Sequence, residues 1–454
     1  MSGMPFFQAF ILLASVVVLI VATRSWRLHP FLAIAAVASA FGLAVGFTTG
    51  FVGKAFGAGF SQAIYSPGLV IVAAGFVAGL AESTAGSVWL TAIIDRWRWL
   101  GPTRLAAFLG LIAGIAASPM AAFALLTPLL RAIAGGTAPK REATMIAPAL
   151  AISASHGLVL FSPVPIAAAA ILDAAWGRVA LFGLPVAVLL VAFGAVWARW
   201  LSVAGTAAQP SMEERPLILE TRSRWPAIVL LAATAIPLLM LTVQSLGDIP
   251  SEPLGGGTAR EMVLGFGRPL FLFLVAAGIM IVGLWQVSAK LLADSGWTGR
   301  ILGNVSGVLL TVGAAGGLQR LCQETGMAEL LGERLLGWHV AGLGGLLVPF
   351  VIAALIKTLQ GSSLVAAITT AGMVQPILAP LGIGDENGRA LATLAIGAGA
   401  MTVSHVNDEY FWLVSASAGL RPLGGLAVVT IGTLLQGLVA VAALLILAVL
   451  IASI

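Results

Sequence analysis

Long apolar runs recur along the whole chain, and they constrain its fold more than any other feature. About 20 consecutive apolar residues cross a bilayer as one helix, and shorter runs are typical of broken or re-entrant segments. Only 9% of the 454 residues are charged, whereas a soluble domain has about 25%. The pattern therefore predicts an all-α polytopic membrane protein with about 10–12 transmembrane spans. The runs are 6–21, 31–47, 69–80, 106–117, 179–196, 227–241, 270–284, 343–356 and 426–451.

The basic residues gather in short polar segments, which accounts for the formal net charge of +5 without a nucleic-acid partner. Cytoplasmic loops of membrane proteins carry an excess of Lys and Arg. Placing these segments in the cytoplasm puts the N-terminus on the outer side of the membrane. The arginines concerned are Arg24, Arg27, Arg96, Arg98, Arg104, Arg199, Arg215, Arg222 and Arg224.

The most polar passage, residues 202–224, divides the chain into two halves of similar length. We predict a first transmembrane repeat over 1–201, a cytoplasmic linker over 202–224 and a second transmembrane repeat over 225–454. Short motifs recur in the same order in both halves, and such symmetry is typical of transporters built from inverted repeats. The matched motifs are Glu82-Ser83 with Glu324-Thr325, Ser118-Pro119 with Ser362-Ser363, and Ser155-His156 with Ser404-His405.

Residues 402–412 place hydroxyl, imidazole, amide and carboxylate groups between apolar segments. Polar and ionisable groups are costly at membrane depth, so they usually mark a pathway or a binding site. Gly and Pro allow a helix to break, and the helix N-termini that a break exposes favour an anion. We therefore predict broken helices and re-entrant hairpins around a site for a negatively charged solute. Further interruptions lie at 82–86, 118–119, 153–157, 162–165, 324–326, 357–363 and 369–372.

Each of these polar residues also has a structural explanation. Ser and Thr in membrane helices often bond to their own backbone or to a neighbouring helix. Asp408 is able to pair with Lys357 simply to stabilise the fold, and Glu82 and Glu324 suit the tips of hairpins. The aromatic residues at 410–412 suit either the wall of a site or an interfacial belt.

Several motifs resemble the gluconate permease family, a group of gluconate:proton symporters in the ion-transporter superfamily. The run Ser-His-Val-Asn-Asp at 404–408, followed by Phe-Trp-Leu at 411–413, is similar to a signature of that family. Gln-Gly-Ser at 360–362 with Thr-Thr-Ala-Gly at 369–372, and the segments 27–33 and 82–85, are similar to others. The resemblance implies a multi-pass protein of the bacterial inner membrane that imports sugar acids with protons. It also implies two repeats with re-entrant hairpins, a scaffold half and a moving transport half.

The chain departs from the family pattern at four places. Residues 118–122 lack the acidic residue that the family usually has there, and residues 160–165 lack a histidine. Lys357 replaces an arginine, which loses a bidentate fork suited to a carboxylate. Glu409 and Tyr410 replace two small residues. These departures concern the identity of the carried acid and of the proton-carrying group.

From the breaks and the resemblance we expect a symporter for a small hydroxylated carboxylate, with no catalytic residues, cofactor or metal ion. Its partners are then an organic anion, protons and the lipid bilayer, without nucleic acid; a scaffold half of this kind often dimerises. His405, Asp408 and Glu409 are the candidates for proton coupling, since an imidazole titrates near physiological pH and a neighbouring carboxylate shifts it. The expected substrate-binding residues are Ser118, Ser155, His156, Gln360, Gly361, Ser362, Ser363, Thr369 and Asn407.

Two other functions remain open from the sequence. A passive anion channel would have the same breaks, but it would show no exchange acceleration and no dependence on a pH gradient. An intramembrane serine hydrolase would use Ser362 as nucleophile with His405 or His156 as base, within hydrogen-bond reach. The duplicated Ser-His pair argues against the hydrolase, because a protease needs no second symmetric site.

Overall fold

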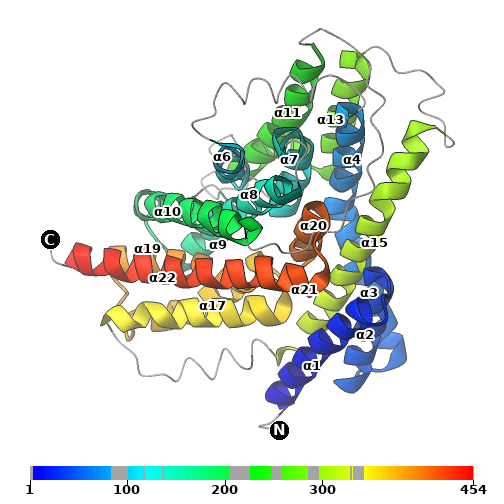
Figure 1. The fold of residues 1–454 in the computed structure, drawn as a ribbon. Helices are drawn as coiled ribbons and strands as arrows, with labels where there is room; N and C mark the ends of the chain where they lie inside the picture. Colours follow the sequence, from blue (N-terminus) through cyan, green and yellow to red (C-terminus); the bar gives the residue numbers. More distant parts are fainter. Residues whose placement is uncertain are drawn as a thin grey trace.

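The computed structural model describes residues 4–82, 101–115, 118–134, 138–160, 162–203, 225–247, 257–284, 296–327, 330 and 342–452. These residues form helices joined by turns and short loops, and there is no strand among them. Figure 1 shows the helices packed into one body, with α20 near its middle. The predicted all-α class is confirmed.

The first half of the chain contains helices of widely different length, several of which begin at a proline. Proline suits the first turn of a helix, where its missing N–H has no partner to lose. The elements are α1 (Met4–Arg24), α2 (Pro30–Ala44), α3 (Thr49–Ala63), η1 (Ile64–Gly68), α4 (Leu69–Glu82), α6 (Pro102–Ala113), α7 (Pro119–Ala134), α8 (Ala138–Leu158), α9 (Pro163–Leu172) and α10 (Trp176–Val203).

The second half contains two interruptions that matter for the site, one between α17 and α18 and one between α19 and α20. The elements are α11 (Trp225–Gly247), α12 (Gly257–Phe266), α13 (Pro269–Leu284), α15 (Trp297–Glu324), η2 (Gly342–Leu346), α17 (Leu347–Gln360), α18 (Ser363–Val374), η3 (Gln375–Ile377), α19 (Glu386–Ala400), α20 (Glu409–Ala418), α21 (Pro422–Gly425), η4 (Leu426–Thr430) and α22 (Ile431–Ala452).

The described residues include six segments long and apolar enough to span a membrane, or seven if a bent pair is one span. Five shorter apolar helices accompany them, as expected of broken or re-entrant segments. The protein is therefore a polytopic membrane protein, while the count of 10–12 spans and the inverted repeats stay predictions. The six segments are Phe6–Thr23, Glu142–Leu172, Trp176–Leu201, Trp225–Gln244, Thr298–Glu324 and Pro422–Ile451.

The outer surface of the long helices is apolar, as a surface in contact with lipid must be. Phe10 on α1 is 67% exposed, Leu181 on α10 is 68% exposed and Ile446 on α22 is 63% exposed. Transferring such side chains from water to hydrocarbon is favourable by about 1.5–3 kcal/mol each. These three helices therefore place their apolar sides against the bilayer.

The inner helices approach one another closely through glycine. A Cβ on Gly397 of α19 would overlap the carbonyl oxygen of Gly157 on α8, so the two backbones are in direct contact. Nearly all of α19 from Gly388 onward is buried. This contact brings the C-terminal end of α8 beside α19, close to the break that follows α19.

Two predictions fall largely outside the described residues. The linker predicted at 202–224 lies there except for Ser202 and Val203, which end α10. The match of Glu82-Ser83 with Glu324-Thr325 is likewise incomplete, because residues 83–85 are not described. Both stay predictions.

Candidate functional site

The two interruptions of the second half meet each other. Helix α17 ends at Gln360, and its C-cap is Gly361, whose φ of +76° is the left-handed conformation that glycine adopts readily. A Cβ at this position would overlap the carbonyl oxygen of Asn407 in the loop between α19 and α20. Only a residue without a side chain fits this contact, so Gly361 lets the two breaks touch.

A buried ion pair joins the same two breaks. Lys357 Nζ lies 2.6 Å from Asp408 Oδ2, and the two side chains are 4% and 9% exposed. The ammonium also donates to the Gly361 carbonyl oxygen at 2.6 Å. Asp408 Oδ2 accepts from Ser404 Oγ at 2.5 Å, and Oδ1 accepts from the Tyr410 backbone N–H at 2.9 Å. Asp408 thus caps α20 while it neutralises Lys357.

The loop between α19 and α20 is held to α17 by two of its own side chains and to α22 by a backbone N–H. His405 Nε2 donates to the Thr358 carbonyl oxygen at 2.7 Å, since a carbonyl only accepts. Asn407 Nδ2 donates to the same oxygen at 2.9 Å. Thr433 Oγ1 accepts from the Ser404 N–H at 3.0 Å. These bonds replace the helical bonds that the break removes, which membrane depth requires.

Helix α18 begins at the cavity side of the first break. Ser362 is its N-cap, and its hydroxyl accepts from the Val365 N–H at 3.4 Å. Ser363 is the first helical residue. The N-terminus of a helix carries a partial positive charge and unpaired N–H groups, both of which favour an anion.

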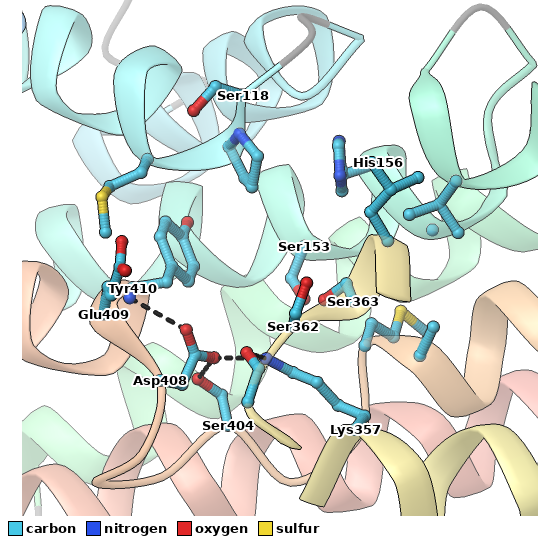
Figure 2. Close-up of a pocket in the computed structure, with 18 of the residues that line it drawn as sticks. Ser118, Ser153, His156, Lys357, Ser362, Ser363, Ser404, Asp408, Glu409 and Tyr410 are labelled. Atoms are coloured by element: carbon cyan, nitrogen blue, oxygen red, sulfur yellow. Dashed lines mark hydrogen bonds and ion pairs between the residues drawn. The ribbon is translucent and has the colours of Figure 1, made fainter. Parts of the chain in front are cut away.

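A cavity of about 260 Å³ opens between these breaks and helices of the first half. Figure 2 shows Lys357 and Asp408 on one side of it and Ser118 and His156 on the other. Helices α3, α7, α8 and α15 also contribute to its lining. The polar lining residues are Gln62, Ser118, Ser153, His156, Gln319, Lys357, Ser362, Ser363, Ser404, Asp408, Glu409 and Tyr410.

The first half supplies hydroxyl and imidazole groups. Ser118 precedes α7, and its hydroxyl accepts from the Ala121 N–H at 3.2 Å. Ser153 and His156 lie three residues apart on α8, on the same side of the helix. His156 belongs to the last turn of α8, so the helix continues through Ser155-His156 and ends at Leu158.

Glu409 and Tyr410 begin α20 and lie at the centre of the site. Tyr410 donates its hydroxyl to the Ala149 carbonyl oxygen of α8 at 2.9 Å, and its ring meets the Phe123 ring of α7 edge-on. Glu409 faces α15, where a Cβ on Gly316 would come within 2.7 Å of Glu409 Oε1. The glycine therefore leaves room for the carboxyl group.

Comparison with known proteins gives the family. The GntP family permease profile matches residues 7–451. The chain belongs to the GntP permease family. It is 28% identical to a gluconate permease of Pseudomonas aeruginosa, over 88% of this chain and 89% of the relative. It is 27% identical to the low-affinity gluconate transporter of Escherichia coli K12, over 89% and 90%. It is 26% identical to the E. coli inner membrane permease YgbN, over 94% and 95%.

This GntP permease is thus a multi-pass protein of the inner membrane and a transporter, as the sequence predicted. Its family and its relatives are permeases, which excludes the hydrolase hypothesis. Ser362 has a structural partner of its own in the Val365 N–H.

Seven of the twelve predicted site residues of the permease line the cavity. They are Ser118, His156, Gly361, Ser362, Ser363, Asp408 and Glu409. The other five are absent from its lining: Ser155 and Gln360 are buried, Thr369 is half-buried, and His405 and Asn407 bond to the Thr358 carbonyl oxygen. Their binding and coupling roles stay predictions.

Sequence reasoning missed several lining residues of the permease. Ser153 has a signal, because it lies three positions before His156 and so shares its face of a helix. Lys357 is absent from the predicted site residues, although its ion pair with Asp408 and its replacement of a family arginine are both readable from the sequence, and it lines the cavity. Gln62 on α3 and Gln319 on α15 have no local signal, because the packing of α3 against α15 places them there.

Proposed function

We propose that this permease is a secondary active transporter that imports gluconate, or a related small hydroxy carboxylate, together with protons. Relatives over most of its length are named gluconate permease or gluconate transporter. The cavity supports the proposal because it combines a cation and a helix N-terminus with hydroxyl groups. This combination suits a solute with one carboxylate and several hydroxyls.

The carboxylate end of the solute fits the second-half side of the cavity. Ser362 and Ser363 offer hydroxyls at the N-terminus of α18, and the Lys357 ammonium lies nearby on α17. An ionised acceptor forms hydrogen bonds roughly twice as strong as a neutral one. We therefore assign the carboxylate to these three residues.

The hydroxyl groups of the solute fit the opposite side. Ser118 before α7 and Ser153 on α8 each place a hydroxyl on the cavity, and a hydroxyl both donates and accepts. His156 adds an imidazole on the same side. Ser155 and Asn407, which we had expected in this role, have no surface on the cavity.

Proton coupling belongs to the same proposal. Two of the three candidates, Asp408 and Glu409, line the cavity, whereas His405 is bonded behind it to Thr358. A protonatable group that shares a cavity with the solute couples the proton flux directly to the solute flux.

A homodimer is also part of the proposal. Native mass spectrometry of the protein in nanodiscs tests it, and a monomeric mass would rule out the dimer.

Vesicles reconstituted with the purified protein test the transport function. Radiolabelled gluconate should enter faster when unlabelled gluconate fills the lumen, and it should accumulate when the outside is more acidic. A carrier shows this exchange acceleration, while a passive channel shows neither effect. If gluconate shows no counterflow and a thermal-shift screen finds that a ligand of another class stabilises the protein, that ligand would take the place of gluconate as the proposed substrate.

A further inference from the structure

The charge of the cavity does not balance. Of the lining residues, Lys357 carries a positive charge, Asp408 and Glu409 carry negative charges when ionised, and His156 is the remaining imidazole. Lys357 is paired with Asp408 at 2.6 Å. With a neutral His156, an ionised Glu409 leaves the cavity with one net negative charge. An anion entering that cavity would meet repulsion instead of a counter-ion.

The Glu409 carboxyl has no hydrogen bond or ion pair within the part of the chain that the structure describes. Figure 2 shows Asp408 between Glu409 and the Lys357 ammonium. On its other side the carboxyl meets Gly316 of α15, which brings no charge. An ionised carboxylate without a cation is costly at this depth.

Charged and titratable groups on the elements around α20 are engaged or distant. Arg320 on α15 pairs with Glu324, four residues further along the same helix. The Tyr410 hydroxyl is bonded to Ala149. Arg131 and Glu142 lie toward the ends of α7 and α8 that are remote from the cavity, which Met120 and His156 line. Arg421, before α21, is exposed. Cys322 on α15 is absent from the cavity lining.

From this charge balance we infer that Glu409 carries the coupled proton, one for each monovalent anion, so that transport is electroneutral. The inference rests on the proposed import of a carboxylate with protons. A proton from outside binds a Glu409 carboxylate oxygen and makes the cavity neutral. The anion then binds at Ser362, Ser363 and Lys357, and both leave on the inner side. The loaded and the empty cavity carry the same charge, so no net charge crosses the membrane.

Asp408 and His405 are poorer proton carriers in this geometry. Both Asp408 oxygens already accept hydrogen bonds, and protonation would leave Lys357 buried without its counter-ion. His405 has no surface on the cavity, and its Nε2–H is bonded to the Thr358 carbonyl oxygen. Glu409 differs from both because it faces the solute and has no other partner among the described residues.

Gluconate uptake into vesicles under separate pH and voltage gradients tests the inference, with Glu409→Gln as the variant. In the wild type, one acidic pH unit outside should give about tenfold accumulation, and a potassium–valinomycin potential should have no effect. Glu409→Gln should keep gluconate counterflow but ignore the pH gradient. Because it moves the anion alone, an inside-positive potential of about 60 mV should now give about tenfold accumulation. Glu324→Gln, a carboxylate of α15 away from the cavity, should behave as the wild type.

Two results would overturn the inference: pH-driven accumulation by Glu409→Gln, or wild-type uptake that an inside-negative potential increases. If the wild type does not transport gluconate, the proposed function fails, and infrared spectroscopy then decides on Glu409 without a substrate. A protonated-carboxyl C=O band that titrates in the wild type and in Glu324→Gln, but is missing in Glu409→Gln, supports the inference. Persistence of that band in Glu409→Gln refutes it.

Discussion

The two serine-capped helices at the cavity, α7 behind Ser118 and α18 behind Ser362, have the same local design. In each, a serine before the helix accepts a hydrogen bond from the N–H three residues later, at 3.2 Å and 3.4 Å respectively. Both serines line the cavity. The surroundings differ, because the Lys, Asp and Glu of the lining all come from the second half. A shared motif therefore supplies the shape of the site, and its charge is confined to one half.

The two Ser-His pairs differ in the same way. His156 lies in the last turn of α8 and faces the cavity, whereas His405 lies in the loop before α20 and bonds to Thr358. Equivalent sequence positions thus have different surroundings. From this comparison we propose a binding role for His156 and a structural role for His405.

Removing the positive charge of Lys357 from the second-half side of the cavity should have the largest effect on stability and uptake. Lys357→Ala leaves Asp408 buried without a cation, and breaking a buried ion pair costs about 3–5 kcal/mol. We expect a large fall of the apparent melting temperature in detergent and loss of gluconate uptake. The double variant Lys357→Gln with Asp408→Asn should recover most of the stability without recovering uptake. If Lys357→Ala and Ser153→Ala had the same melting temperature, the buried ion pair would contribute no more to stability than an uncharged residue of the opposite side of the cavity.

Gly361→Ala tests the contact between the two second-half breaks. A left-handed conformation costs a residue with a Cβ about 1–2 kcal/mol, and here the methyl group also overlaps the Asn407 carbonyl oxygen. We expect lower thermal stability and strongly reduced uptake. The control is Gly372→Ala on α18, where an added Cβ meets no atom within 4 Å. Equal behaviour of the two variants would contradict the contact.

The two histidines should separate stability from binding. His405→Ala removes a buried hydrogen bond to Thr358, and a buried group left without its partner costs about 1–3 kcal/mol. It should lower the melting temperature. His156→Ala should raise KM for gluconate while the melting temperature changes less. Melting curves and uptake kinetics of both variants test this. A higher KM for His405→Ala together with a lower melting temperature for His156→Ala would exchange the two roles.

The two capping serines should show the smallest difference. Each loses its cap on substitution by alanine, at about 1 kcal/mol of stability. Ser362→Ala also loses a contact to the carboxylate, and hydrogen bonds to charged groups contribute about 1.5–3 kcal/mol against about 0.5–1.5 for neutral ones. The KM for gluconate should therefore rise more for Ser362→Ala than for Ser118→Ala. A larger rise for Ser118→Ala would place the carboxylate in the first half.

The fold class and the second-half side of the cavity were predictable because their signals are local. Apolar run length gives the membrane helices, and the Gly361-Ser362 pair marks both the end of one helix and the cap of the next. The direction in which a side chain points was harder to obtain. Ser155 faces the protein interior while Ser153, two residues earlier on α8, faces the cavity. The three-residue spacing from Ser153 to His156 is the local signal for this difference, and it is readable only once the helix is known to continue through His156.

Residues contributed by packing between distant helices were beyond sequence reasoning. Gln62 and Gln319 reach the cavity because α3 packs on α15 and α15 on α20. His405 and Asn407 carry the most specific motif of the family resemblance, yet the Thr358 carbonyl oxygen engages both. A polar motif at membrane depth therefore located the site but did not distinguish its surface from its support.

The contacts of Tyr410 restrict how α20 moves relative to the first half. Its hydroxyl bond to Ala149 and its edge-on contact with Phe123 fasten the start of α20 to two helices of the other half. A displacement that parts α20 from α8 must break the hydroxyl bond, and a displacement that parts α20 from α7 must break the ring contact. Asp408 and Glu409 are therefore tethered, through the neighbouring Tyr410, to the helix that carries His156, and a movement that separates them must first break that bond.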